Sequence, residues 1–545
     1  MRRPRLRRVV SWTSVLLVGI LVLGTWLRVR GLAWGLPYGF QNPDESVVIA
    51  RAVRVARGHA NPEFFAYPSL LFYVLGAVLR GVAVVVRPAA GDSVLSPAAL
   101  VVDPSPLYVA GRILSASCGV ISVYLVFRLG RETYGRAAGL LAALLLAVEP
   151  LHVRYSHVAV TDVPAVTLGL AALVLFARAA RVGSTRLIAW GALAAGLATS
   201  TKYNLALLVV AAVPALWFAL RDPARRRSPN GYLGSLAVLV GGPMLGGFLA
   251  GTPFAVLDPF HFLGDYWRVQ HTVGRGWLGF EHAGNGYWYN LATNLAGSLG
   301  VVLLVVCLAG LCYAVWCHRR PDIVLVPYVL VYYLYVSSWH QLQDRYLLPI
   351  VPLLLLLASR LCMALARARS SRLAPASRRR LALATTVAAA LVFAAALALP
   401  LRTSVTYVRG LRGDDTRAVA KTWIERHLPA DSVVATDVYG PPLVPSIFRD
   451  YYRDAGRRPV TYHVVSLQLP EPGVEDDEHT LEFLRERGVR YVAVSSGVYD
   501  RVLAAPETYP AQADFYRRLG REAERLATFS AGRGQRGPTI TVYEL

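Results

Sequence analysis

The sequence predicts an α-helical membrane protein with about eleven spans, interfacial helices in its first outer loop, and a small exported α/β domain at its C-terminus. Hydrophobic residues make up 55% of the 545 residues and charged residues only 17%, whereas a typical soluble protein carries about 25% charged residues. Long apolar runs recur as far as residue 401, and clusters of arginine separate them. These observations exclude a disordered chain and an ordinary soluble protein, and they point to a membrane protein.

The net charge of +23 divides the chain into two parts. Residues 402–545 carry 20 basic and 20 acidic side chains, so the whole excess of cations belongs to residues 1–401. We therefore expect a polytopic transmembrane domain at 1–401 and an extracytoplasmic α/β domain at 402–545. Arginine clusters between apolar runs follow the positive-inside rule, which makes membrane lipid the expected partner. No basic face remains for nucleic acid.

A window of about 19 residues locates the predicted spans. The run at 67–86 is long enough to cross, but a crossing there would place Arg128, Arg131 and Arg136 outside. We therefore interpret it as an interfacial or re-entrant segment. The expected spans are 9–28, 108–127, 137–150, 163–178, 187–200, 204–220, 232–254, 291–316, 323–338, 346–363 and 381–401.

Charge asymmetry gives the predicted orientation in the inner (plasma) membrane. With the N-terminus in the cytoplasm, the inner segments hold 24 arginines against three acids, Glu132, Asp222 and Asp322. The C-terminal domain is then extracytoplasmic, and the arginine-rich N-terminus is an uncleaved signal anchor. All five cysteines lie within or at the ends of spans, so no disulfide is expected in the exported parts.

Local patterns predict the elements of the C-terminal domain. Acidic residues begin a helix at 414–427, and Asp414 and Asp415 are interpreted as its cap. Because this region has no phosphate loop, metal-ligand spacing or nucleophile constellation, packing or acceptor docking is its expected role. The predicted strands are 432–438, 460–465, 491–494 and 539–543.

Acidic residues occur at the outer ends of two different spans. Asp44 and Glu45 follow Pro43 shortly after the first span, and Asp162 lies just before Pro164 at the start of another helix. Helix capping explains Asp44 alone as well as catalysis does. Two such positions on one face, close to the bilayer, favour chemistry. The candidate catalytic residues are therefore Asp44, Glu45 and Asp162.

Cationic and aromatic residues on the same face are candidates for binding a phosphate or another part of a substrate. The chain contains 55 arginines but two lysines, so Lys202 in an outer turn indicates a specific role, with a snorkelling interfacial cation as the alternative. In a later outer loop, Asp344 and Arg345 could neutralise one another, or they could join Arg112 in a cationic pocket for a lipid-linked phosphate. The binding candidates are Arg112, Lys202, Tyr203, His340, Arg345 and Tyr346.

A series of short motifs, taken in order, resembles a known family. PDE follows the first span, YPSLLFYVLG precedes the second, and TDVP, TKYN and DRYLLPIVP come after it on the outer face. They resemble the bacterial members of the dolichyl-phosphate-mannose protein mannosyltransferase family, which includes the aminoarabinose transferases and belongs to the C-type glycosyltransferase superfamily. The resemblance covers roughly residues 10–401, and it rests on the order of the motifs.

The resemblance implies a membrane glycosyltransferase that moves a hexosyl or pentosyl group from a polyprenyl-phosphate donor to a hydroxyl acceptor. The acceptor would be a protein, a lipid or a cell-envelope glycan. Asp44 and Asp162 match the aspartates of the family's first and second outer loops. Three cations, Arg112, Lys202 and Arg345, match positions that could hold the donor phosphate. The motif YPSL departs from many relatives, and this leaves the sugar and the acceptor open.

The chemistry fits the same class. A sugar phosphate already carries a good leaving group, so the site needs a base for the acceptor and cations for the departing charge, and we expect no cofactor and no metal. Direct displacement would invert the anomeric centre, whereas retention requires a second carboxylate as nucleophile. Two alternatives stay open: a polysaccharide ligase or polymerase that uses a diphosphate-linked glycan, and a lipid flippase or transporter.

Overall fold

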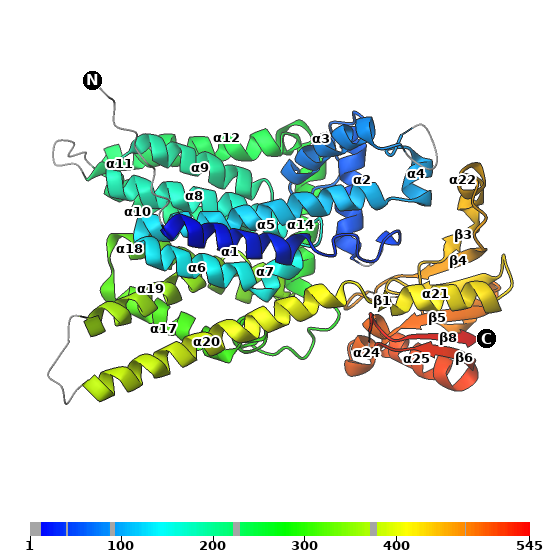
Figure 1. The fold of residues 1–545 in the computed structure, drawn as a ribbon. Helices are drawn as coiled ribbons and strands as arrows, with labels where there is room; N and C mark the ends of the chain where they lie inside the picture. The colour runs from blue at the N-terminus through cyan, green and yellow to red at the C-terminus, as the bar shows by residue number, and fades with distance from the viewer. Residues whose placement is uncertain are drawn as a thin grey trace, which may run out of the picture.

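Long helices form a bundle, and a sheet-bearing C-terminal part lies at one end of it in the computed structural model of the protein (Figure 1). The structure describes residues 12–39, 42–87, 93–221, 229–370, 379–474, 476–532 and 534–545. Several residues that are predicted to be cytoplasmic lie outside these ranges, namely the arginines before residue 12, those at 225–227, Arg372, Arg378 and the acid Asp222.

Helices occupy all eleven segments that the hydropathy pattern predicts as spans. The long ones are α1 (Trp12–Val29), α5 (Ser105–Thr133), α6 (Arg136–Val148), α8 (Asp162–Val182), α9 (Thr185–Thr199), η2 with α10 (Tyr203–Leu208, Val209–Leu220), α11, η4 and α12 (Pro229–Leu236, Ala237–Gly241, Gly242–Gly251), α15, η5, α16 and α17 (Gly286–Tyr289, Asn290–Leu295, Ala296–Leu299, Val301–Cys317), α18 (Arg320–Ser337), α19 (Val351–Ser370) and α20 (Arg379–Gly410).

Among the described residues, five helices are long and apolar enough to cross a membrane. The number is six if the pair Gly286–Leu299 and Val301–Cys317, which is bent by 116°, counts as one broken span. The protein is therefore a mostly helical, multi-pass membrane protein, and the count of eleven crossings stays a prediction.

Small residues let neighbouring helices approach closely. A Cβ atom on Gly196 of α9 would lie 2.0 Å from the backbone oxygen of Met244 in α12, and a Cβ on Gly247 would lie 2.4 Å from the backbone oxygen of Leu193. Both positions therefore need glycine, because the two backbones are in contact there. Such small-residue contacts are typical of helices that pack in a bilayer.

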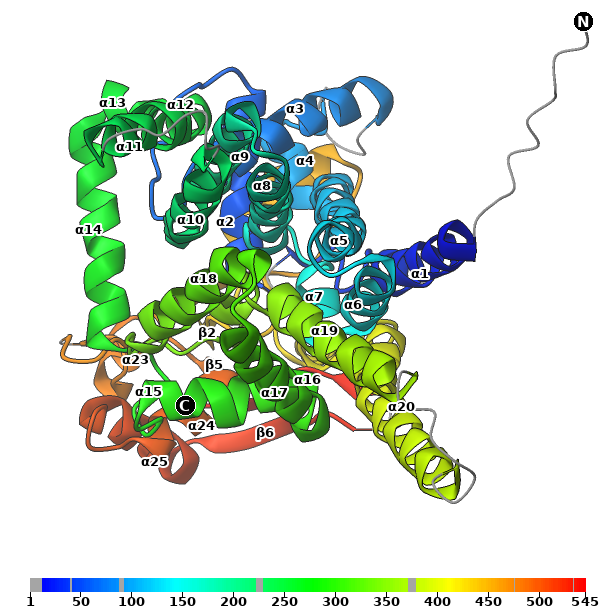
Figure 2. The ribbon, with the colours of Figure 1, turned by 90° about the vertical axis from the view of Figure 1, so that its left-hand side faces the viewer.

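Shorter helices connect the long ones at the end of the bundle that faces the sheet. They are α2 (Pro43–Ala56), α3 (Leu70–Val85), α4 (Pro97–Val102), α7 (Pro150–Tyr155), α13 (Phe254–Leu257), α14 (Pro259–Arg275) and η6 (Asp344–Leu347). Figure 2 looks along the bundle and shows α3 and α14 lying crosswise to the long helices. A crosswise α3 is compatible with the interfacial or re-entrant segment expected at 67–86, which stays a prediction.

A mixed six-stranded sheet organises the C-terminal part, with strand order β3-β4-β2-β5-β8-β6. Strands β3, β4, β2 and β5 are parallel, β8 is antiparallel to β5 and β6, and a separate short ladder joins β1 to β7. The elements are β1 (Asp414–Asp415), α21 (Thr416–His427), β2 (Val433–Asp437), β3 (Val444–Pro445), η8 (Ser446–Phe448), α22 (Arg449–Asp454), β4 (Thr461–Leu467), α23 (Leu481–Glu486), β5 (Tyr491–Ser495), α24 (Ser496–Ala504), α25 (Pro510–Glu522), β6 (Glu524–Phe529), β7 (Gln535–Arg536) and β8 (Ile540–Glu544).

All four predicted strands correspond to strands of this part, while β6, α24 and α25 were not predicted. The capping interpretation is confirmed for Asp415, whose side chain accepts a hydrogen bond from the backbone N–H of Arg417. All five cysteines are free.

Candidate active site

Four charged side chains from four separate segments meet at the end of the bundle that faces the sheet. Asp44 lies in the first turn of α2, Asp162 is the first residue of α8, Lys202 lies in the turn between α9 and η2, and Arg345 lies in η6. Arg345 forms an ion pair with Asp44, and Lys202 forms one with Asp162. Each group stands at a helix end, where the chain leaves the apolar bundle and a polar side chain can reach its partner.

Neither aspartate is occupied in capping a helix. Asn42 is the N-cap of α2 and Thr161 is the N-cap of α8, and Asp44 and Asp162 instead direct their carboxylates to cations. The hydroxyl of Tyr67 donates a second hydrogen bond to Asp44, with an oxygen–oxygen distance of 3.0 Å. The geometry thus does not support the capping interpretation of either aspartate, and their catalytic roles stay predictions.

Tyr346 connects the two ion pairs. The centroid of its ring lies 5.0 Å from Nζ of Lys202 and 5.7 Å from Cζ of Arg345. A cation near an aromatic ring is attracted by the ring's quadrupole, and the attraction grows when water is excluded. Tyr346 therefore holds two cations near one another without neutralising either.

Burial and neighbouring charge act in opposite directions on the acid. Burial alone raises the pKa of Asp44, but the charge and hydrogen bond of Arg345, helped by Tyr67 and Lys202, outweigh it, and the pKa is lowered from its usual value. Burial and the charge of Asp44 raise the pKa of Tyr67 well above its usual value. Asp44 is therefore an ionised carboxylate at neutral pH. Tyr67 stays protonated, and its hydroxyl donates a hydrogen bond to Asp44.

The two cations respond differently to the same surroundings. Burial lowers the pKa of Lys202, and the opposing charge of Asp162 does not fully compensate. Burial also acts to lower the pKa of Arg345, but Asp44 and Asp162 overcome it, and the pKa is raised well above its usual value. Arg345 is thus a permanent charge at the centre of the cluster.

Glu45 and Arg112 form a third ion pair, which is buried. Nε and Nη2 of Arg112 donate to the two carboxylate oxygens of Glu45 at 2.8 and 2.7 Å, and the side chains are 1% and 0% exposed. Nη1 of Arg112 donates to the backbone oxygens of Leu32 and Trp34. These bonds occupy all three nitrogens of the guanidinium, so phosphate binding by Arg112 stays a prediction that the observed contacts do not favour.

Two further binding candidates lie apart from the charged cluster. The hydroxyl of Tyr203 donates to the backbone oxygen of Phe65 at 2.8 Å, and its ring packs edge-on against Tyr266 of α14. His340 is exposed, and its backbone N–H donates to the oxygen of Val273 near the end of α14. Both residues contact the region of the crosswise helix α14, and their roles in binding stay predictions.

Asp344 does not neutralise Arg345, which was one of the two interpretations of this sequence pair. It pairs instead with Arg154 and accepts a hydrogen bond from the hydroxyl of Tyr155 at 3.0 Å. The backbone turn of η6 sends these adjacent side chains to different partners. This arrangement leaves Arg345 free to face Asp44.

Sequence reasoning missed Tyr67 as a site residue. Tyr67 begins the motif YPSLLFYVLG, which predicts an apolar helix. The local pattern does not indicate that the hydroxyl of this tyrosine donates a hydrogen bond to Asp44. The described residues contain no group of three or more histidine, cysteine or acidic side chains that could hold a metal ion. The cluster consists of two carboxylates, Asp44 and Asp162, and two cations, Lys202 and Arg345.

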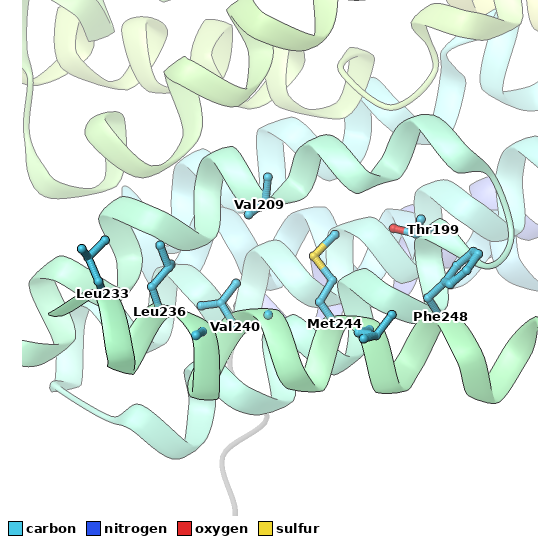
Figure 3. A pocket seen from close by; sticks show the side chains of 10 residues that line it. Thr199, Val209, Leu233, Leu236, Val240, Met244 and Phe248 are labelled. Atoms are coloured by element: carbon cyan, nitrogen blue, oxygen red, sulfur yellow. The ribbon is translucent and has the colours of Figure 1, made fainter. Parts of the chain in front are cut away.

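An apolar groove lies between four helices of the bundle. It has a volume of about 380 Å³ and is lined by side chains of α9, α10, α11 and α12, with Thr199 and Phe248 at one end and Leu233 at the other (Figure 3). Thr199 lies three residues before Lys202 in the chain. One end of the groove is therefore lined by a residue that is near Lys202 in the sequence.

Comparisons with known proteins agree with the resemblance found in the sequence. Residues 107–245 match the model of the family described as dolichyl-phosphate-mannose-protein mannosyltransferase. A comparison with curated protein sequences finds no match. The family match covers α5 to α12, which carry Asp162 and Lys202.

Solved structures share the fold along almost the whole chain. ArnT from Cupriavidus metallidurans in the apo state has a TM-score of 0.52 and 14% identity, with 97% of each chain covered, and the same protein bound to undecaprenyl phosphate has a TM-score of 0.50. The archaeal oligosaccharyltransferase AglB from Archaeoglobus fulgidus, in complex with an inhibitory peptide and a dolichol-phosphate, has a TM-score of 0.53 and 13% identity, covering 97% of this chain and 74% of that one. At such identities the likeness concerns the fold alone.

Proposed function

We propose that this chain, a member of the C-type glycosyltransferase superfamily, transfers a sugar from a polyprenyl-phosphate donor to a hydroxyl acceptor on the outer face of the inner membrane. The observation that carries the proposal is the convergence of Asp44, Asp162, Lys202 and Arg345 at one end of the helical bundle. These four groups match what such a transfer requires, namely a base for the hydroxyl and positive charge for the departing phosphate.

The donor phosphate is assigned to Arg345 and Lys202. Arg345 is a permanent cation, Lys202 is paired with Asp162, and Tyr346 lies beside both. A planar guanidinium and a compact ammonium can share a phosphate's oxygens. As the sugar–phosphate bond breaks, negative charge accumulates on these oxygens, so the same contacts strengthen in the transition state.

Phosphate binding and base activation are linked in this arrangement. Arg345 pairs with Asp44, and a phosphate on Arg345 competes for the same guanidinium. When the phosphate takes that partner, burial again raises the pKa of Asp44, and the carboxylate becomes a stronger base. Donor binding thereby prepares Asp44 to accept the proton of the acceptor hydroxyl.

Asp44 is the proposed base, and Asp162 has a supporting role. Asp162 holds Lys202, so its removal disturbs the phosphate site first. A single displacement at the anomeric carbon, with Asp44 deprotonating the acceptor, inverts the configuration of the sugar.

The apolar groove between α9 and α12 is the proposed place for the polyprenyl chain (Figure 3). Its end at Thr199 lies close in the chain to Lys202, so a lipid in the groove would carry its phosphate to the cations. Two proteins with the same fold were solved with such a lipid, undecaprenyl phosphate in ArnT and dolichol-phosphate in AglB.

The orientation follows from the charge asymmetry of the loops, and it can be tested directly. In a variant without native cysteines, Ser46→Cys and Ser496→Cys should react with an impermeant thiol reagent added from outside. Labelling of either residue only from the cytoplasm contradicts the proposed orientation.

The activity is tested with the purified full chain in detergent, membrane extract as acceptor, and donors radiolabelled in the sugar. We expect transfer from one or more polyprenyl-monophosphate sugars, and inverted configuration in the product. The double variant with Asp44→Asn and Asp162→Asn is the inactive control. Transfer only from a diphosphate-linked glycan indicates a ligase or polymerase. Movement of the donor across a vesicle membrane without bond cleavage indicates a flippase.

A further inference from the structure

The ring of Trp34 is shared between two arginines from distant parts of the chain. Cζ of Arg112, in α5, lies 4.8 Å from the ring centroid, and Cζ of Arg536, in β7 of the C-terminal part, lies 4.6 Å from it. Trp34 belongs to the turn that leads from α1 toward α2. A side chain of the C-terminal part thus contacts the same ring that supports the buried ion pair of Arg112.

Backbone contacts fix the position of Arg536. The short β1–β7 ladder places Arg536 opposite Asp415, directly after α20. A Cβ on Gly413 would lie 2.4 Å from the backbone oxygen of Gly534, so the two strands approach as closely as glycine allows. Nε of Arg536 is buried and has no hydrogen-bond partner among the described residues. The guanidinium is therefore placed for its ring contact.

From Trp34, one series of contacts leads to Asp44. The backbone oxygen of Trp34 accepts a hydrogen bond from Arg112 at 2.7 Å. Arg112 also donates two hydrogen bonds to the carboxylate of Glu45. Glu45 directly follows Asp44 in the first turn of α2. A shift of Arg112 is therefore transmitted to the helix turn that presents Asp44.

A second series leads to Asp162. The indole N–H of Trp34 donates to the backbone oxygen of His157 at 3.2 Å. The carboxylate of Glu45 also accepts from the backbone N–H of Ala159 at 2.8 Å. Because Ala159 lies three residues before Asp162, the loop that carries this aspartate is tied to the same group.

We propose that Trp34, held by Arg536, is a positioning residue that sets the placement of Asp44 and Asp162, so that the C-terminal part completes the transfer site. This inference rests on the proposed function for the meaning of the two aspartates. It gives the C-terminal part a specific role, because Arg536 contacts Trp34, from which both series of contacts lead to the carboxylates.

The test compares Arg536→Ala, Arg536→Lys and Trp34→Leu in the full chain with Arg487→Ala as the matched control. Arg487 also lies over an aromatic ring, 4.8 Å from the centroid of Phe483, but within the C-terminal part and exposed. Two measurements are made on each variant: the kinetics of sugar transfer with donor affinity, and amide hydrogen exchange by mass spectrometry.

We expect Arg536→Ala to lower kcat about 10-fold, because small misplacements of a catalytic group slow chemistry strongly. Donor affinity should fall less than kcat does, because Arg345 and Lys202 are both present even where their carboxylate partners are displaced. Arg536→Lys should recover most of the rate, since an ammonium also binds the ring. Adding Arg536→Ala to Trp34→Leu should cost little more than Trp34→Leu alone, because both remove one contact.

Hydrogen exchange tests, independently of sugar transfer, whether Arg536 affects the segments that carry Asp44 and Asp162. Exchange should rise in Arg536→Ala at the start of α2 and in the 157–162 loop, and it should match the wild type in Arg487→Ala. If the wild type transfers no sugar while these segments respond, the proposed function fails and the coupling stands. Unchanged exchange in Arg536→Ala, or a parallel loss of kcat and donor affinity, overturns the positioning role.

Discussion

Arg345 donates to the carboxylate of Asp44 across 301 positions of the chain. The first residue comes from a short turn after α18 and the second from the first turn of α2, so tertiary packing alone brings them together. The pair joins the proposed base to the proposed phosphate-binding cation. Donor binding at the guanidinium of Arg345 can therefore change the basicity of Asp44, which accepts the proton in the proposed transfer.

Replacing the proposed base should remove catalysis while leaving the donor bound. Asp44→Asn keeps the size of the side chain and a hydrogen bond to Tyr67, but the amide cannot accept the acceptor's proton. General-base catalysis contributes roughly 100- to 10,000-fold, so transfer should fall by about that factor. Asp162→Asn should lose less. The measurement is the transfer rate beside donor affinity, with the exposed Asp450→Asn as control. Near-normal turnover by Asp44→Asn would show that Asp44 is not the base, and Asp162 would then be the candidate.

Removing a phosphate-binding cation should affect donor binding and turnover together. Arg345→Gln and Lys202→Gln should each weaken binding of a polyprenyl phosphate and slow transfer, because the departing phosphate uses the contacts of the bound one. Arg154→Gln, which removes a neighbouring cation paired with Asp344, is the matched control. The assignment is wrong if both variants keep wild-type donor affinity and turnover.

The Glu45–Arg112 pair should matter for folding rather than for phosphate binding. Glu45→Gln leaves the guanidinium of Arg112 buried without a counter-charge, and breaking a buried pair in this way costs about 3–5 kcal/mol. We expect lower thermal stability in detergent for Glu45→Gln and for Arg112→Gln. If Arg112→Gln is as stable as the wild type but binds the donor more weakly, Arg112 takes part in phosphate binding.

The acid limb of the pH profile should depend on Arg345. In the wild type, the pKa of Asp44 is lowered, so the carboxylate stays ionised and its ion pair persists until the pH falls below the usual range of an aspartate. The charge and hydrogen bond of Arg345 are the largest influences that oppose burial, so their loss should leave this pKa higher than in the wild type. Arg345→Gln should therefore lose kcat/KM for the donor at a higher pH than the wild type does, because this parameter reports the donor-free enzyme, in which Arg345 pairs with Asp44. An acid limb in the same position for both proteins contradicts the coupling.

Asp437 should make the C-terminal sheet sensitive to pH. Burial raises the pKa of this carboxyl from 3.8 to about 6, although Ser495 and Tyr516 donate hydrogen bonds to it. The folded state then favours the protonated form, so stability is greatest at low pH and falls as pH rises from about 4 to about 6. The loss amounts to about 3 kcal/mol.

Hydrogen exchange of the β2 and β5 amides at pH 4 to 7, corrected for intrinsic rates, measures this effect. Asp437→Asn should abolish the pH-dependent part, and Asp450→Asn should retain it. A pH dependence that survives in Asp437→Asn assigns it to another group.

Hydrophobic patterning and charge determined much of the architecture from the sequence alone. Each apolar run long enough to be a span is helical, and the four predicted strands are present, because burial of a face imposes a period that local sequence must carry. The sequence also marked Lys202 and the two aspartates as candidates, since ionisable residues at the ends of apolar helices are costly and rarely incidental, and the structure brings the three together.

Only the tertiary structure decided which of these charges meet. Asp344 and Arg345 are neighbours in the chain but take different partners, and Arg112 proved to belong to Glu45. Tyr67 and Arg536 carry no local signal at all. The physical reason is that an ion pair or a ring contact depends on distances of a few ångströms between helix ends, which packing sets. Sequence spacing fixes only which face of its own helix a residue occupies.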